Sequence, residues 1–254
     1  MIFESYTRMH RYHTRKAGLL AVGIYMASML LYYVVGLALR HQGLRLFIPA
    51  SLLITAGVVI LALLKSGGLK SIGLGTKDAG KSALLGLITG GVFFFSGRIV
   101  LGATLFERGI GGVTLTRFMG DPRFTHVPEA TLGSWLPGAL LFVGISVITQ
   151  EVLVRGYLGT RITGLIRNEW LAVIVTAFIF ALLFIPMQAP MLMRSLGWVF
   201  LSYVPMQLVW LFVLHVWLQF LYRSFNSLAA PIIFHMFFSF HSNLSLGIFY
   251  ALGA

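Results

Sequence analysis

Apolar runs long enough to cross a lipid bilayer recur along the whole chain. A spanning helix needs about 20 mostly apolar residues. Seven segments meet this requirement, and they cover residues 17–38, 46–64, 82–105, 134–155, 170–188, 196–221 and 227–251. Because lipid offers the backbone no hydrogen-bond partner, such runs must fold as helices. The sequence therefore predicts an all-α fold: a polytopic membrane helix bundle with about seven transmembrane helices.

The composition supports a membrane protein and argues against a nucleic-acid partner. Apolar residues make up 58% of the chain and charged residues only 10%, whereas a soluble domain carries roughly a quarter charged residues. The net charge of +12 comes from basic residues that lie between the apolar runs. This arrangement favours membrane lipids with anionic headgroups as partners and no nucleic acid. The chain has no cysteine, which excludes disulfides and a thiolate nucleophile.

The sequence indicates one transmembrane domain behind a short basic segment. Residues 1–16 form the basic N-terminal segment, and residues 17–254 form the single transmembrane domain. The first apolar run lacks the small-residue cleavage site of a signal peptide, so we expect it to remain as an anchor. The connection over residues 107–133 is rich in Gly and Arg, and we expect a surface loop or an interfacial segment there.

The distribution of basic residues predicts the orientation of the bundle. With seven spans, twelve basic residues fall on the side of the N-terminus and six on the opposite side. Because cytoplasmic connections carry the excess of Lys and Arg, the N-terminus is predicted to be cytoplasmic. The short chain without eukaryotic targeting signals indicates a bacterial cytoplasmic (inner) membrane.

Two opposite charges stand at the end of the fourth predicted helix. Glu151 and Arg155 lie at a depth where each charge costs about 2.5–3.5 kcal/mol to insert. They are one helical turn apart, so we expect a structural ion pair between them. A general-base role and a substrate-binding or proton-linked role for Glu151 remain open beside this structural one.

The same decapeptide carries a family resemblance. The run Gln150-Glu151-x-x-x-Arg155-Gly156-Tyr157 resembles the Glu-Glu-x-x-x-Arg signature of the CAAX-protease and bacteriocin-processing family, also called CPBP or Abi. Downstream, a helix ends at Phe184 where the family has the histidine of Phe-x-x-x-His. The last apolar run then carries His235 and Ser239, where the family has His-x-x-x-Asn. The resemblance covers roughly residues 70–245.

The resemblance implies an intramembrane glutamate-type endopeptidase, similar to type II CAAX prenyl endopeptidases. In the family the first glutamate activates a water, and the histidines and the asparagine bind this water or stabilise the oxyanion. Three of these positions are substituted here: Gln150 replaces the first glutamate, Phe184 the first histidine and Ser239 the asparagine. A glutamine cannot accept a proton at neutral pH, and a phenylalanine neither donates nor accepts. The resemblance therefore implies a degenerate active site, as in a pseudoenzyme.

The three retained residues and Ser239 form the candidate site. Glu151, His235 and Ser239 are the candidate catalytic residues, and Glu151 with Arg155 is the candidate brace. His235 and His215 each have a simpler reading as interhelical hydrogen-bonding residues. A metal site built from Glu151 with His215, His235 and His241 is possible on paper. However, the histidine spacing matches no metal motif, so we expect no metal and no cofactor.

Two functions from different classes follow. The first is an endopeptidase that processes peptides or lipidated proteins, with weakened or lost catalysis. The alternative is a non-catalytic scaffold or assembly subunit that binds another membrane protein or a lipidated peptide. A transporter that uses Glu151 as a proton site is a third reading, but no inverted repeat supports it.

Glycines in the third predicted helix indicate a packing face, because small residues spaced four apart let helices approach closely. They are Gly86, Gly90, Gly91, Gly97 and Gly102.

Overall fold

The computed structural model describes residues 15–38, 44–64, 68–105, 132–166, 168–196 and 200–239. Throughout these ranges the regular structure is helical, which confirms the predicted all-α class. The elements are α2 (Arg15–Ala38), α3 (Leu44–Leu63), the 3₁₀-helix η1 (Gly68–Ile72), α4 (Ala79–Leu105), α7 (Leu132–Glu151), the π-helix η3 (Val152–Gly159), α8 (Thr160–Ile166), α9 (Glu169–Leu196), α10 (Phe200–Phe225) and a last helix over Ala229–Ser239.

Six of the seven predicted apolar runs coincide with helices, with small shifts at the ends, and the seventh, predicted over 227–251, is described only as far as Ser239. The fifth run was expected to end at residue 188, and α9 continues to Leu196. The sixth was expected over 196–221, and α10 covers Phe200–Phe225. Most of the expected loop over 107–133 lies outside the described residues, and α7 already begins at Leu132. The first fourteen residues of the basic segment also lie outside them, and Arg15 begins α2.

Three described helices are long and apolar enough to cross a bilayer on their own. They contain the stretches Arg15–Val34, Ala79–Ser96 and Leu208–Phe225. Shorter apolar helices cover Ile48–Leu63, Glu169–Leu182 and Ala229–Ser239. The bundle is therefore suited to a membrane, while the number of seven spans stays a prediction.

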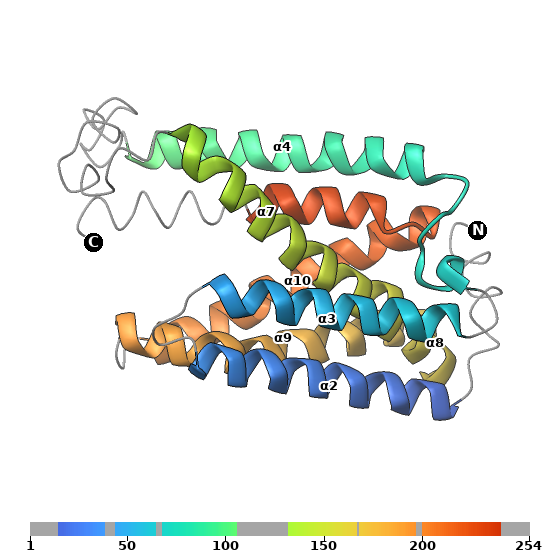
Figure 1. Ribbon diagram of the computed structural model, residues 1–254. Helices are drawn as coiled ribbons and strands as arrows, with labels where there is room; N and C mark the ends of the chain where they lie inside the picture. The colour runs from blue at the N-terminus through green and yellow to red at the C-terminus, as the bar shows by residue number, and fades with distance from the viewer. Residues whose placement is uncertain are drawn as a thin grey trace.

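The helices form an elongated bundle in which α7 runs obliquely (Figure 1). Helix α2 packs against α3 and α9, and α9 packs along α10. Helix α4 lies on the far side of the bundle from α2, next to the last helix, and α7 crosses between α4 and α3 (Figure 1). Large apolar side chains on the outer faces are exposed, such as Leu53 and Phe95. A surface of this kind is typical of helices that face lipid.

The π-helix η3 occupies the centre of this arrangement. It contacts α2, α3, α9, α10 and η1, and all eight of its residues are buried. Its side chains Leu153, Tyr157 and Leu158 belong to the main apolar core together with Tyr25 of α2. The polar decapeptide of the sequence therefore lies inside the bundle, not at its surface.

Two of the five glycines predicted to form a packing face lie against the last helix. A Cβ added at Gly86 would lie 2.7 Å from the carbonyl oxygen of Ala230, and one at Gly90 would lie 2.6 Å from the Phe237 ring. The prediction gains no support at Gly91, where an added Cβ would meet nothing within 4 Å among the residues that the structure describes. The remaining two positions, Gly97 and Gly102, lie outside the described part of this helix surface.

A turn after η1 ties the centre of the bundle to the last helix. Gly73 has a φ of +78°, a conformation that glycine adopts at little cost. Its carbonyl oxygen accepts a hydrogen bond of 3.1 Å from the backbone N–H of Leu228. On the other side, Gly156 of η3 lies so close to Ile72 that an added Cβ would come 2.8 Å from its carbonyl oxygen. These two contacts fix η1 between η3 and the start of the last helix.

Candidate active site

Glu151 and His235 meet in the interior of the bundle. Glu151 is the last residue of α7 and is fully buried, and His235 of the last helix is 6% exposed. The Nδ1 of His235 lies 2.6 Å from Oε1 of Glu151. Because an ionised carboxylate only accepts hydrogen bonds, Nδ1 is the donor. Two residues 84 positions apart are thus joined by a short hydrogen bond.

The predicted ion pair between Glu151 and Arg155 is present. The Nη1 of Arg155 donates to the same Oε1 at 2.8 Å, and both side chains are buried. Oε1 therefore receives two hydrogen bonds, one from η3 and one from the last helix. Burying a charge without a partner is costly, so each of these groups depends on the other for its place in the core.

His215 of α10 joins this network through Arg155. Its Nδ1 contacts Nη2 of Arg155, and since a guanidinium only donates, Nδ1 accepts. A neutral His215 then carries its proton on Nε2. The imidazole packs against the Phe180 ring of α9, with the ring centroids 3.4 Å apart. The contact makes His215 an interhelical hydrogen-bonding residue, as expected, and also a neighbour of the site.

Three buried polar atoms around Arg155 have no hydrogen-bond partner among the residues that the structure describes. They are Oε2 of Glu151, Nε2 of His215 and the hydroxyl oxygen of Tyr25. Buried polar atoms nearly always have a partner. These atoms are therefore the ones available to a water or to a polar group of a substrate.

Gln150 lies apart from this network. It is half-buried, and its amide nitrogen donates to the hydroxyl of Ser146 at 3.3 Å, one turn back along α7. The residue at the substituted position is therefore not the one that contacts the histidine. The retained Glu151 makes that contact instead.

The structure gives less detail on the other candidate residues from the sequence. Ser239 is partly buried and lies one helical turn after His235. Phe184 falls within α9, but its side chain is not among those described. His241 lies outside the described residues. Within the described ranges, no three His, Cys, Asp or Glu residues gather closely enough to hold a metal ion, so the metal reading gains no support there.

A comparison with models of protein families gives a match over the segment that holds these residues. Residues 132–241 match the model of the family described as type II CAAX prenyl endopeptidase Rce1-like. This part of the chain is similar to the Rce1-like family. The match contains Glu151, Arg155, His215 and His235, and with the apolar helices it makes the chain an integral membrane protein. No curated protein and no solved structure matches the chain.

Sequence reasoning did not anticipate the closeness of His215 and Tyr25 to the candidate site. Each lies among apolar residues near the middle of a mostly apolar helix, α10 and α2 respectively. Polar residues at membrane depth tend to face the bundle interior and to mark functional sites. That signal places both residues inside the bundle, but it does not say which partners they meet.

Proposed function

We propose that this protein is a slow membrane endopeptidase that cleaves peptide segments of membrane-bound or lipidated proteins. The single observation that supports the proposal most is the 2.6 Å contact between Glu151 and His235. A carboxylate hydrogen-bonded to an imidazole is an arrangement that can activate a water and steady the charge that develops on a peptide carbonyl. In this proposal Glu151, His235 and Ser239 carry the chemistry.

The reaction is a hydrolysis in which Glu151 carries the proton. Glu151 takes a proton from a water bound at Oε2, and the hydroxide adds to the carbonyl carbon of the peptide. The carbonyl oxygen becomes an oxyanion, which the Ser239 hydroxyl and the Nε2–H of a doubly protonated His235 stabilise as donors. The C–N bond then breaks, and the leaving nitrogen takes the proton from Glu151.

Arg155 and His215 act as positioning residues in this proposal. Arg155 binds Oε1 and so leaves Oε2 as the oxygen that faces the water. His215 holds the second nitrogen of the guanidinium from α10. Catalytic acids and bases are commonly held in orientation by a second side chain in this way.

Three features favour a slow enzyme. Glu151 is fully buried, so water and substrate need an opening of the bundle before they reach it. Oε1 already receives two hydrogen bonds, which leaves one oxygen for the water. Gln150 and Phe184 replace the groups that supply a base and a histidine in the family that the sequence resembles.

The alternative is a non-catalytic subunit, and a specific observation favours it. The carboxylate of Glu151 closes directly onto Arg155 with no exposed surface on either side chain. A closed ion pair of this kind braces the end of α7 against η3 without any chemistry. Such a protein would serve as a scaffold for another membrane protein or for a lipidated peptide.

The proposal includes the orientation and location expected from the sequence. The N-terminus lies in the cytoplasm, and the membrane is a bacterial cytoplasmic membrane. The distribution of Lys and Arg supports this orientation.

A cleavage assay distinguishes the two functions. The purified protein in lipid nanodiscs is incubated with a farnesylated CAAX peptide that carries a fluorophore and a quencher, and with its unprenylated form. We expect slow cleavage by the unmodified protein and a loss of about 10²-fold in Glu151→Gln, the amount that a general base contributes. No fluorescence increase above a protein-free control with the folded, unmodified protein would favour the non-catalytic function instead.

A further inference from the structure

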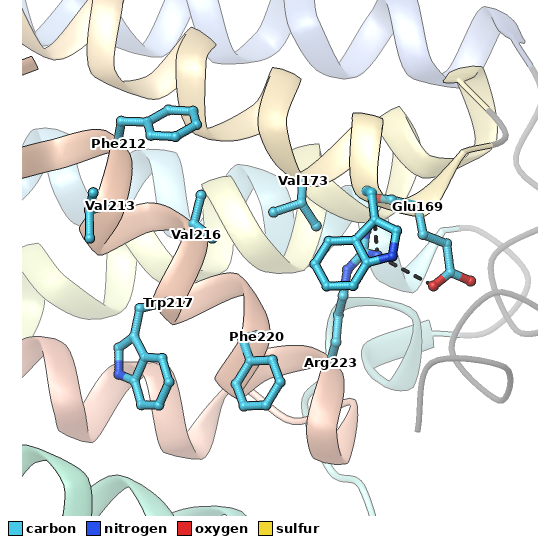
Figure 2. A pocket seen from close by; sticks show the side chains of 9 residues that line it. Glu169, Val173, Phe212, Val213, Val216, Trp217, Phe220 and Arg223 are labelled. Atoms are coloured by element: carbon cyan, nitrogen blue, oxygen red, sulfur yellow. Dashed lines mark hydrogen bonds and ion pairs between the residues drawn. The ribbon is translucent and has the colours of Figure 1, made fainter. Parts of the chain in front are cut away.

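A second feature of the bundle lies away from Glu151: an apolar groove between α9 and α10. Its volume is about 350 Å³, and its walls are apolar side chains (Figure 2). They include Val173 of α9 and Phe212, Val216, Trp217 and Phe220 of α10. Figure 2 shows these side chains following α10 towards Glu169 and Arg223, which close one end of the groove. The groove is therefore apolar along its length and polar at one end.

The residue at this end, Arg223, is held in place from two sides. It is only 4% exposed, and its Nη2 donates to the hydroxyl of Thr163 at 3.1 Å. Its Nη1 donates to the backbone carbonyl of Glu169 at 3.3 Å and lies 3.7 Å from the Glu169 carboxylate. These bonds fix the guanidinium as a positive group at the end of the groove.

Arg223 also lines a second, polar pocket of about 330 Å³. This pocket includes Lys70 and Lys77, both exposed, together with Asp78. Asp78 is already paired with Lys81 at 3.5 Å, so the pocket keeps an excess of positive charge. The hydroxyl of Thr76 also faces this region and has no hydrogen-bond partner among the residues the structure describes. Lysines, a hydroxyl donor and a buried arginine together suit a phosphate group.

We propose that these two pockets bind one anionic phospholipid. Its phosphate lies by Lys70 and Lys77, and one acyl chain follows the groove between α9 and α10. Charge complementarity supports the headgroup position, and the apolar walls support the chain. The basic residues concerned lie at the end of the bundle that the charge distribution assigns to the cytoplasm, where anionic lipids gather.

The proposal is independent of the proposed protease activity, but it has a consequence for the site. Helix α9 carries Phe180 and helix α10 carries His215, whose rings pack together. A lipid bound between these two helices would hold them in one relative position. The content of anionic lipid in the membrane would then affect the geometry around Arg155.

Tryptophan quenching tests the site directly. The chain has five tryptophans, and Trp170 lines the groove at 64% exposure. A variant that keeps only Trp170, with Phe at the other four positions, is placed in phosphatidylcholine nanodiscs. One fifth of the lipid is then exchanged for dibrominated phosphatidylglycerol or for dibrominated phosphatidylcholine. We expect at least about twofold stronger quenching by the anionic lipid.

Two control variants separate this site from general lipid contact. A variant that keeps only Trp210, which is 46% exposed and lines a different groove, reports on ordinary lipid neighbours. It should be quenched equally by both lipids. Lys70→Gln with Lys77→Gln should make the quenching of Trp170 by the two lipids equal, since each lysine near a headgroup changes an affinity by about fivefold and the two together by about 25-fold. Circular dichroism checks that each variant is folded.

Three results would overturn the proposal. Equal quenching of Trp170 by both lipids would mean ordinary annular contact. An anionic preference that is equal at Trp170 and Trp210, or that survives the lysine substitutions, would mean a general effect of surface charge. Recovery of Trp170 fluorescence on adding a farnesylated peptide, but not on adding unlabelled phosphatidylglycerol, would assign the groove to a lipidated peptide. Native mass spectrometry of the unmodified chain gives a second measurement, with retention of phosphatidylglycerol over phosphatidylcholine as the expected result.

Discussion

At the scale of single residues, one carboxylate oxygen of Glu151 accepts hydrogen bonds from two side chains. Arg155 and His235 both donate to Oε1, at 2.8 and 2.6 Å. The first contact joins neighbouring turns of one helical segment, and the second joins two helices far apart in the sequence. A single carboxylate therefore links local structure to the assembly of the bundle. Its loss affects both stability and any chemistry, and the two effects need separate measurements.

Removing the carboxylate should destabilise the fold through Arg155. Glu151→Gln leaves a buried guanidinium without a counter-charge, and breaking a buried pair in this way costs about 3–5 kcal/mol. The double variant Glu151→Gln with Arg155→Met should recover much of that loss, because it leaves no charge unpaired. Unfolding in detergent, followed by circular dichroism, measures the three free energies.

Glu169→Gln is the matched control for this prediction. It removes a carboxylate that is 21% exposed and 3.7 Å from Arg223, which keeps its hydrogen bonds to Thr163 and to the Glu169 carbonyl, and it should cost less than the Glu151 substitution. A double variant less stable than the single Glu151→Gln variant would contradict the role of the ion pair as a brace.

At this scale the sequence predicts the contacts that depend only on the spacing of residues along a helix. Glu151 and Arg155 are four residues apart, so their contact follows from helix geometry alone. The choice of His235 came from the family resemblance. The orientation of Gln150 towards Ser146 and the contact of His215 with Arg155 depend on how α7 and α10 pack. A single sequence does not contain that information.

At the scale of elements, the π-helix η3 is the feature that the sequence did not reveal. Its eight residues, Val152–Gly159, carry no proline and have an apolar pattern that fits an α-helix equally well. π-Helical turns are rare and are frequently found at functional sites. All eight residues of η3 are buried. Tertiary packing on every side is therefore the physical cause of its π-helical conformation. Packing of this kind is decided by the whole bundle.

The glycines of α4 give a matched pair for testing helix packing. Gly86→Ala places a methyl group 2.8 Å from Cα of Ala230, and we expect a loss of about 1–3 kcal/mol from overpacking. Gly91→Ala, on the same helix, meets nothing within 4 Å. It should be neutral or raise stability by up to about 1 kcal/mol, since Ala is the better helix former.

Thermal unfolding in detergent checks both substitutions. Equal effects of the two substitutions would mean that α4 does not pack on the last helix through Gly86. The sequence predicted a five-residue glycine face, and only the structure separates the glycines that touch a neighbour from the one that does not.

At the scale of the whole molecule, the apolar runs predicted the helical bundle and nearly all of its helix positions. They did not predict which helices lie side by side, because apolar residues surround most of these helices and do not mark a buried face. The expected cytoplasmic N-terminus follows from the basic residues alone.

The absence of cysteine from the chain makes the orientation simple to test. Lys77→Cys and Ala254→Cys are labelled in intact cells with a maleimide that does not cross membranes. With seven spans, we expect labelling of residue 254 from outside the cell, and of residue 77 only after permeabilisation. Labelling of both residues in intact cells, or of residue 77 alone, would contradict the predicted topology.

The central claim is that Glu151 acts as a base and not only as a brace. The most direct test compares the rates at which Arg155→Met and Glu151→Gln cleave the farnesylated peptide in nanodiscs. Both variants break the ion pair, but only Glu151→Gln removes the carboxylate. We predict that Arg155→Met cleaves at least about tenfold faster, since a general base contributes about 10²-fold or more. Equal rates in the two folded variants would contradict the claim and leave Glu151 as a structural residue.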